Sequence, residues 1–364
     1  MSLTSKSPRM VTLAALAVGK EALPDYSHRF SPKVYTQPQL FACLVLMAFL
    51  RTDYRGIEQH LLDFAAYRDW LGLKEVPDHS TYQKAAVRFL GRAAALRLLS
   101  GSVKLTLGRR TVIPRAAADG TGLESGHRSP YFVQRKHRGQ KKAKNPQYQT
   151  TTYPRFPKLT LLIDCAHHLV LGLKTARGPK PDMHDLPELL AGRPRQLTLL
   201  KVVADAGFDS EENHRYLRDE HGIVSVIPPK IGRPSAKPPA GRWRRRMRSL
   251  LRTKRKRRRC GYTQRWQVET VNSMLKRNLS DELFSRSYHA QCREMRLLVL
   301  THNIMILIFV GEVFDRALQV YSRGRPFAPL HVNGNGNRML SLHKNLNRTS
   351  LYLRKRNEFS KNVE

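Results

Sequence analysis

The feature that most restricts the fold is a set of short apolar runs in the middle of the chain. Four of these runs predict strands, at residues 112–119, 159–164, 168–176 and 197–205. The last of them, LTLLKVVAD, is almost continuously apolar, which is typical of a central strand buried on both faces. Residues 224–228 predict one more strand, and EENHRYLRDEH before it predicts a helix. Strands that alternate with helices indicate an α/β domain with a mixed sheet.

The first hundred residues follow a different pattern, in which apolar residues recur at helical spacing. They predict helices over residues 37–50, 54–73 and 79–99, with Ser80 as the N-cap of the third. Three short helices with a sharp turn before the third resemble a helix-turn-helix, whose third helix would read DNA. A helical packing domain is the other interpretation of the same pattern.

These patterns divide the chain into three parts. We predict a small all-α domain at residues 1–105, for DNA binding or packing, and an α/β domain at residues 106–318. The remaining residues, 319–364, are rich in Gly, Asn and Arg and predict a basic, mobile tail.

The charge of the chain indicates the class of its partner. The 364 residues include 65 Lys and Arg against 28 Asp and Glu, which gives a formal net charge of +37. A surplus of this size attracts polyanions, and nucleic acid is the abundant one. Fifteen of the cations lie in residues 230–260, a segment without acids that predicts a solvated loop. Within it, Arg244, Arg245 and Arg246 are candidate DNA-binding residues.

Two observations bear on the compartment. No apolar run reaches the roughly 20 residues of a membrane helix, and the first residues show no secretory signal. The four cysteines form no CxxC pair, which is typical of a reducing environment. We expect a cytoplasmic protein without a membrane partner.

Two aspartates at the ends of apolar runs are candidate metal ligands. Asp119 stands in AAADGTG and Asp205 in VVADAGFD, each followed closely by glycine. A carboxylate at a strand end is desolvated enough to hold a hard cation, and glycine lets a substrate approach the backbone. Asp before Gly is also an ordinary strand-to-turn signal, so each motif alone has two interpretations.

A third carboxylate follows the basic segment, in GYTQRWQVETVNSMLKRNL. At about 100° per residue, four polar residues of this helix fall on one face: Tyr262, Arg265, Glu269 and Lys276. Apolar residues on the opposite face would pack on the sheet. A solvated stripe of mixed charge, with an intrahelical ion pair between Arg265 and Glu269, is the other interpretation.

The spacing Tyr-x2-Arg-x3-Glu-x6-Lys at these four positions resembles the signature around the catalytic glutamate of DDE transposases of bacterial insertion sequences. The group is the one numbered families four and five. DGTGLE at Asp119 and DAGFDS at Asp205 resemble the same group, in the order Asp, Asp, Glu. VPDHSTY and IPPK are similar to further segments of it. The resemblance covers residues 37–310.

The resemblance implies a ribonuclease H-like catalytic domain in which Asp119, Asp205 and Glu269 hold two Mg²⁺ or Mn²⁺ ions. One ion would activate water or a DNA 3′-hydroxyl, and the other would stabilise the leaving oxygen. The best-known members carry a folded β-strand insertion before the glutamate. Because residues 230–260 are short and basic here, we expect no folded subdomain in their place.

The resemblance also implies a function and its partners. The chain would be a transposase that binds the ends of an insertion sequence and cuts and transfers DNA strands. Tyr262, Arg265 and Lys276 would grip phosphates near the cleavage site. The partners would be terminal inverted repeats and target DNA, bound by a homodimer on paired ends in a prokaryotic cytoplasm, at the nucleoid. A ribonuclease H-like nuclease of junctions or hybrids, or a non-catalytic DNA-binding descendant, are the alternatives.

Other carboxylates have structural interpretations. Asp164, on the hairpin strand, and Glu124, shortly after the first aspartate motif, are expected to support the fold. Asp182 and Asp185, in PDMHDLPELL, fit a helix N-terminus better than a metal cluster. Ser210 or Asp209 could cap the helix that follows, and Asp209 is the expected cap.

Overall fold

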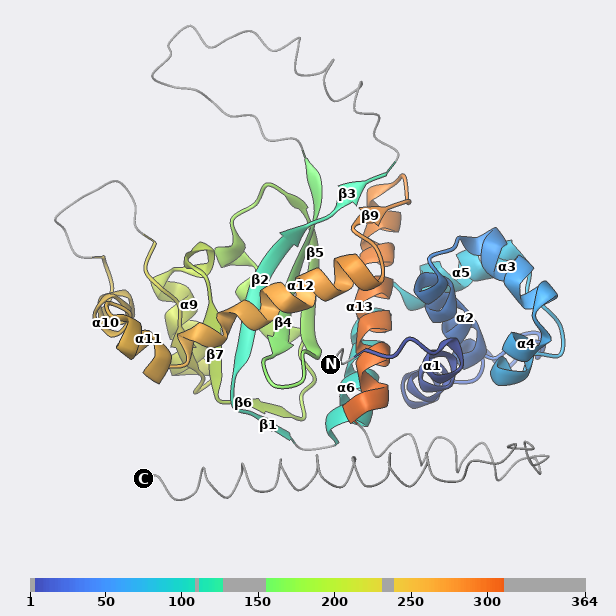
Figure 1. Cartoon of the computed structure of the whole chain (residues 1–364), viewed down its shortest axis with the longest axis horizontal. Helices are drawn as coiled ribbons and strands as arrows, with labels where there is room; N and C mark the ends of the chain where they lie inside the picture. Colours follow the sequence, from blue (N-terminus) through green and yellow to red (C-terminus); the bar gives the residue numbers. More distant parts are fainter. Residues whose placement is uncertain (1–3, 109–110, 127–154, 231–238, 311–364) are drawn as a thin grey trace, which may run out of the picture. The chain divides into compact units, whose positions relative to one another are not determined.

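The centre of the fold is a five-stranded mixed sheet with the strand order β5-β4-β2-β7-β8 (Figure 1). Its strands are β2 (Ala116–Gly122), β4 (Phe156–Asp164), β5 (Val170–Gly178), β7 (Lys201–Ala204) and β8 (Val224–Val226). β4 runs antiparallel to both of its neighbours, whereas β2, β7 and β8 are parallel to one another. The mixed sheet confirms the predicted ribonuclease H-like α/β class.

The computed structural model describes residues 4–108, 111–126, 155–230 and 239–310. Two short strand pairs lie outside the central sheet, namely β1 (Thr111–Ile113) with β6 (Leu197–Leu199), and β3 (Glu124–Ser125) with β9 (Glu282–Leu283). The predicted tail lies outside the described residues, and the domain borders at residues 105 and 318 stay predictions.

The N-terminal region is helical, as predicted. Its helices are α1 (Pro8–Ala22), α2 (Gln37–Leu50), α3 (Tyr54–Asp63), α4 (Ala65–Leu71), α5 (His79–Phe89) and α6 (Arg92–Leu107). The prediction for residues 37–50 is confirmed, but each of the two longer helices is split in two. The first breaks at Phe64 and the second at Leu90 and Gly91, where the backbone leaves helical geometry.

The N-cap prediction for the third helix is wrong by two residues. Asp78 caps α5, because its carboxylate accepts a hydrogen bond from the Ser80 backbone N–H at 2.8 Å. A carboxylate and a hydroxyl are both good N-cap groups, so the sequence offered two neighbouring candidates.

The two faces of the sheet are covered by different helices. Along β2, Ala116 and Ala118 belong to a buried cluster that includes the leucines of α8 (Leu186–Ala191). Side chains alternate between the faces of a strand, so Asp119 points to the other face. That face carries α12 (Trp266–Asn278), which crosses β2 and β4 (Figure 1). Asp119 therefore lies under α12.

The last described helix, α13 (Tyr288–Val310), is fixed to the sheet by a buried amide. Asn303 accepts a hydrogen bond from the Val170 N–H at 2.9 Å and donates one to the Val170 carbonyl at 2.8 Å. Its amide also donates to Ser102 of α6 at 3.2 Å. In the part of the chain that the structure describes, no helix is both long and apolar enough to span a membrane.

The basic segment before α12 is folded, which corrects the prediction of an open loop. It contains α10 (Arg242–Leu250) and α11 (Lys254–Arg259) and follows α9 (Glu211–Arg215) and a π-helical turn, η3 (Tyr216–Glu220). The carboxylate of Glu211 accepts the backbone N–H groups of Trp243 and Arg244 at 3.0 and 3.1 Å. Glu211 of α9 thus caps α10, and the local charge repulsion does not prevent folding.

Candidate active site

Asp119 and Asp205 stand side by side on two parallel strands. β2 and β7 are paired in register at Ala118 and Ala204, and each aspartate is the next residue. Asp119 lies within β2, whose pairing with β4 continues to Gly122, whereas its pairing with β7 ends at Ala118. The pairing of β2 with β7 therefore ends just before the two carboxylates.

The Asp119 carboxylate lies in a protein environment that disfavours its charge. The pKa of Asp119 is raised to about 6, mainly by burial and also by the nearby charge of Asp205, while a hydrogen bond from the Gly120 N–H opposes both effects. The Asn272 amide of α12 donates to Asp119 Oδ2 at 3.3 Å. Two adjacent carboxylates with partly uncompensated charge suit a bound cation, since its charge would remove their repulsion.

Asp205 is held by the turn that follows it. It caps η2 (Ala206–Phe208), and its Oδ1 accepts the Gly207 backbone N–H at 2.8 Å. A Cβ atom on Gly207 would lie only 2.9 Å from that oxygen. The glycine in VVADAGFD therefore allows the carboxylate to fold back on its own turn.

Glu269 lies on the first turn of α12 and is paired with a cation. Its Oε1 is 2.5 Å from Arg265 Nη2, and its side chain is 53% exposed. Among the described residues, Asp119, Asp205 and Glu269 do not form a group whose ligand atoms all lie within 4.8 Å of one another. The structure thus places the two aspartates together, with the glutamate on the helix above them and turned to Arg265. This oxygen-only donor set is the type that Mg²⁺ and Mn²⁺ prefer.

The remaining signature residues do not all share one helix. Tyr262 and Arg265 belong to a 3-10 turn, η4 (Tyr262–Arg265), and α12 begins only at Trp266, so the predicted single helical face is wrong for them. Both still lie near the carboxylates. The charge of Arg265 lowers the pKa of Asp119, and the charge of Asp205 raises the pKa of Tyr262, which burial raises most. Lys276 lies in the last turn of α12.

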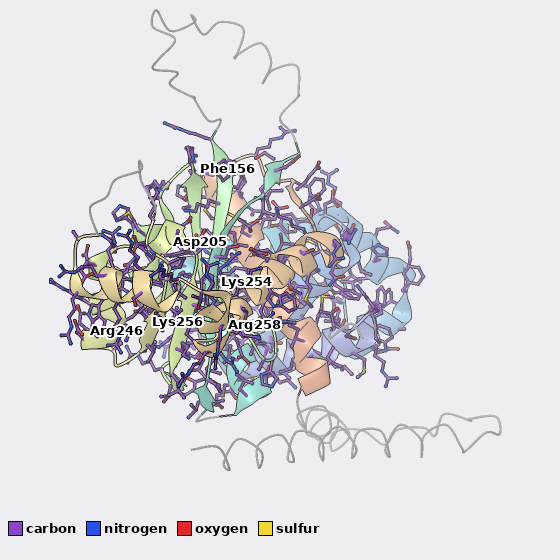
Figure 2. All side chains as sticks on the ribbon, turned by 60° about the vertical axis from the view of Figure 1, so that its left-hand side comes forward. Phe156, Asp205, Arg246, Lys254, Lys256 and Arg258 are labelled. Carbon is purple, nitrogen blue, oxygen red and sulfur yellow. The ribbon has the colours of Figure 1, made fainter. Side chains whose placement is uncertain are left out.

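The three candidate arginines of α10 have different surroundings. Arg244 is bound to the buried carboxylate of Asp209, with Nη2 2.6 Å from Oδ2. Arg245 and Arg246 are exposed, and Arg246 lies over the Trp243 ring at 5.7 Å. Figure 2 labels Arg246 of α10 together with Lys254, Lys256 and Arg258 of α11. The exposed cations are the ones available to a polyanion.

Asp209 does not cap α9 as predicted. Ser210 is the N-cap, and its hydroxyl accepts the Asn213 N–H at 3.0 Å. The carboxylate of Asp209 accepts hydrogen bonds from the Arg244 guanidinium and, at 2.8 Å, from the Lys230 backbone N–H. Asp209 thereby connects the turn after Asp205 to the basic helices.

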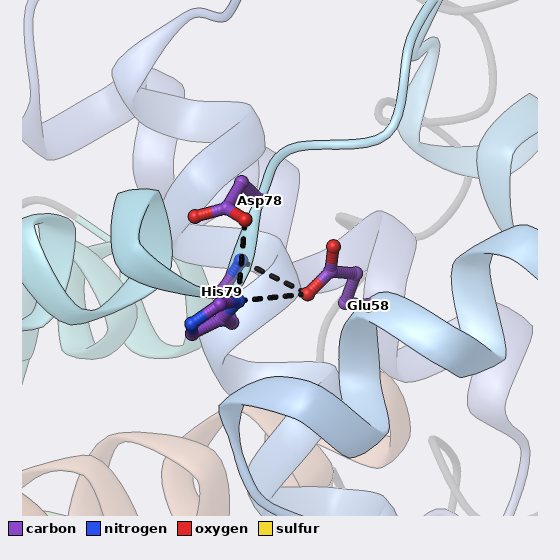
Figure 3. Close-up of side chains that lie close together, drawn as sticks. All are labelled: Glu58, Asp78 and His79. Atoms are coloured by element: carbon purple, nitrogen blue, oxygen red, sulfur yellow. Dashed lines mark hydrogen bonds and ion pairs between the residues drawn. The ribbon is translucent and has the colours of Figure 1, made fainter.

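A histidine with two carboxylates lies in the N-terminal region, between α3 and α5 (Figure 3). His79 Nδ1 is 3.2 Å from both Glu58 Oε2 and Asp78 Oδ2. The backbone N–H of His79 donates to the same Glu58 oxygen at 3.1 Å, and Asp78 caps α5. These hydrogen bonds connect α3 to α5 and explain why the three residues lie together, and we assign the cluster no metal.

Sequence reasoning missed Asn272 and Lys158 near the aspartates, and it set Asp182 aside as a residue of a helix N-terminus. Asn272 lies three residues after Glu269 on α12, and this spacing is a signal that could have indicated it. Lys158 and Asp182 form an ion pair at 2.5 Å beside Gly120, the residue after Asp119. They come from β4 and from η1 (Asp182–His184), and no spacing in the sequence relates them to Asp119.

Comparison with known proteins gives a matching family and similar solved structures. Residues 111–304, more than half of the chain, match the family described as transposase DDE domain. Among the curated proteins, none matches this sequence. The cryo-EM structure of the piggyBac transposase synaptic complex with hairpin DNA is similar over 90% of this chain and 84% of that chain, at 10% identity and a TM-score of 0.40. A likeness this distant carries no conclusion about the present chain.

Proposed function

The chain belongs to the transposase DDE domain family, and from this premise we propose that it binds the ends of an insertion sequence and catalyses metal-dependent cleavage and transfer of DNA strands. The observation that carries the proposal is the register of β2 with β7, which sets Asp119 beside Asp205. The family implies a metal-dependent nuclease or transferase, and paired carboxylates are what such chemistry requires.

In this proposal Asp119, Asp205 and Glu269 hold two Mg²⁺ or Mn²⁺ ions. Such ions activate a water or a DNA 3′-hydroxyl and stabilise the leaving oxygen of an in-line displacement at phosphorus. The chain itself fixes the carboxylates. The Asn272 amide holds Asp119, and the Gly207 N–H holds Asp205. Both hydrogen bonds orient the carboxylate oxygens before a ligand arrives, which lowers the cost of binding.

In the same proposal, DNA phosphates near the carboxylates are bound by Tyr262, Arg265 and Lys276. The guanidinium of Arg265 suits this role best, because it lies close enough to Asp119 and Glu269 to interact with both charges and can bind a phosphate through two hydrogen bonds. The exposed Arg245 and Arg246 of α10 bind DNA phosphates further from the reacting bond, whereas Arg244 supports the fold.

The wider setting follows from the same premise. The Tyr-Arg-Glu-Lys signature supports membership of the group numbered families four and five, and we propose that the chain acts on terminal inverted repeats and on target DNA. We further propose a homodimer assembled on paired ends, in a prokaryotic cytoplasm at the nucleoid. The net charge of +37 supports a DNA partner.

A cleavage assay on DNA that carries the ends of the element tests the proposal. Wild type, Glu269→Gln and Glu124→Gln are compared with Mg²⁺, with Mn²⁺ and after removal of metal by chelation. Glu124 is a matched control, since it is an exposed glutamate on β3 five residues after Asp119. We expect nicking that requires metal, is lost in Glu269→Gln and is kept in Glu124→Gln, with DNA binding retained in all three.

The products then separate the alternatives. Strand-transfer products with short target duplications are expected of a transposase, and cleavage without transfer would favour a nuclease of the same fold. If wild type and Glu269→Gln bind DNA tightly and neither cleaves it, the chain is a non-catalytic DNA-binding protein. Equal cleavage by both would show that Glu269 is not a catalytic residue.

A further inference from the structure

Asp182 is a carboxylate that the proposed mechanism does not use, and its two oxygens lie over the glycines that follow Asp119 and Asp205. It is the first residue of η1, which follows β5. Its Oδ1 lies 2.7 Å from the point where a Cβ atom on Gly120 would lie, and its Oδ2 lies 3.0 Å from the corresponding point on Gly207. Gly120 follows Asp119 directly, and Gly207 is two residues past Asp205. Any side chain at either glycine would displace Asp182.

The local turn does not account for this carboxylate. The hydrogen bond that closes η1 runs from the Asp185 N–H to the backbone carbonyl of Asp182, at 2.9 Å. Asp182 begins η1 and Asp185 is the N-cap residue of α8, so their predicted place at a helix N-terminus is confirmed, although neither side chain caps a helix. Both carboxylates are bound to lysine instead.

The two oxygens of Asp182 have different surroundings. Oδ1 is 2.5 Å from Lys158 Nζ, which also pairs with Asp185 Oδ2 at 3.1 Å. The Lys158 side chain is only 6% exposed, so its ammonium group is fixed in place. Oδ2 makes no hydrogen bond or ion pair to any residue that the structure describes. It approaches the same point over Gly207 as Asp205 Oδ1, which lies 2.9 Å from that point.

A cavity of about 400 Å³ opens beside Asp182 on the side of Gly120 and Lys158, and neither Asp119 nor Asp205 lines it. A hydrated ion or a substrate phosphate would find space there, next to Asp182. Mg²⁺ usually keeps several of its waters and is held by few carboxylates together with substrate phosphate. An additional oxygen ligand with free space around it fits that coordination.

We propose that Asp182 is a fourth carboxylate of the cation site, with Oδ2 directed toward the ions held by Asp119 and Asp205 and Oδ1 held in place by Lys158. This inference rests on the proposed function. Because Lys158 engages one oxygen and leaves the other free, it acts as a positioning residue for Asp182. The network with Asp185 connects this arrangement to the buried core of the α8 side.

Mn²⁺ binding to the full chain tests this role without any need for catalysis. The EPR signal of free Mn²⁺ is followed during titration of wild type, Asp182→Asn, Asp205→Asn and Glu188→Gln. Glu188 is a matched control, because it lies on α8 near Asp182 and pairs with Lys174 and Arg92. The double variant Lys158→Met/Asp182→Asn removes the same carboxylate without leaving an unpaired lysine, in case Asp182→Asn alone does not fold.

The outcomes separate this inference from the proposed function. We expect Asp182→Asn, alone or in the double variant, to weaken Mn²⁺ binding roughly ten- to hundredfold, and Glu188→Gln to change it less than about twofold. Weak binding by Asp205→Asn together with wild-type affinity of both Asp182 variants would overturn the role of Asp182 alone. Wild-type affinity of Asp205→Asn would overturn the cation site itself.

Discussion

The Arg244 guanidinium forms an ion pair with the buried carboxylate of Asp209, and its Nε and Nη2 atoms lie 2.9 Å and 2.6 Å from Asp209 Oδ2. The Asp209 side chain is fully buried, and that of Arg244 is 23% exposed. The pair connects α10 to the turn that begins at Asp205. An arginine from a strongly basic segment thus supports the fold, while its neighbours Arg245 and Arg246 face solvent.

We expect Arg244→Gln to lower the free energy of unfolding by about 3 kcal/mol, because it leaves the Asp209 carboxylate buried without its partner. Arg245→Gln removes the same charge one residue away from an exposed position, and we expect a change of less than about 0.5 kcal/mol. Urea unfolding of both variants measures the difference. Equal midpoints would show that the Arg244–Asp209 pair does not stabilise the chain.

The pKa of Asp119 predicts a stability effect that depends on pH. The group has a pKa of 3.8 when unfolded and about 6 when folded, so the folded chain binds this proton more tightly. The ionisation of Asp119 therefore lowers the free energy of unfolding. This effect is absent below about pH 4, grows between about pH 4 and 6, and is complete above that range. The fully developed effect is at most about 3 kcal/mol.

Asp119→Asn removes the charge and should therefore stabilise the protein at neutral pH in the presence of a chelator. We expect a gain of about 1–3 kcal/mol near pH 7 and none near pH 4. Urea unfolding at both pH values measures the gain, with Glu124→Gln as the control for an exposed carboxylate. The same gain at both pH values would contradict the assignment to Asp119 ionisation.

Some of the fold and site follows from the sequence because it depends on local patterns. The apolar runs located the five central strands, and the strand that leads to Asp205 was recognisable as buried on both faces. The breaks at Phe64 and Gly91 were harder to locate, since the apolar spacing continues across them. Periodicity locates an element better than it locates the element's ends.

Other features depend on groups that are distant in the sequence. The charge of residues 242–259 predicts an extended loop, yet Asp209 and Glu211, more than thirty residues earlier, hold α10 in a helix. Asp182 lies near the turn after Asp205 only because η1, which follows β5, contacts η2. Sequence spacing cannot report such contacts, since they are created by the packing of separate elements.

The hydrogen bonds of the buried Asn303 amide lead us to expect that two substitutions lower the free energy of unfolding by different amounts. Asn303→Leu removes both hydrogen bonds to Val170 and the one to Ser102, and it leaves buried backbone groups without partners. We expect a loss of about 2–4 kcal/mol. Ser102→Ala removes one hydrogen bond to the amide and should cost about 1 kcal/mol. Thermal or urea unfolding ranks the variants, and an equal loss in both would contradict the role of the Val170 bonds.

The exposed cations of α11 predict the salt dependence of DNA binding. Lys254, Lys256 and Arg258 are exposed, so each is free to contact a phosphate and release a counterion. Each such contact contributes about −0.9 to the slope of log K against log salt concentration. We expect the triple glutamine variant to reduce the magnitude of the slope by about two to three, across different DNA sequences alike.

Fluorescence anisotropy with labelled duplex DNA at several salt concentrations measures this slope. Arg195→Gln is the control, because Arg195 is also exposed but lies before β6, in the turn that follows α8. Its slope should match wild type within error. A triple variant that binds more weakly with an unchanged slope would show that α11 affects the DNA-binding surface through its fold. A variant that binds as tightly as wild type, with the same slope, would place the DNA away from α11 altogether, since phosphate contacts cannot be removed without a change in counterion release.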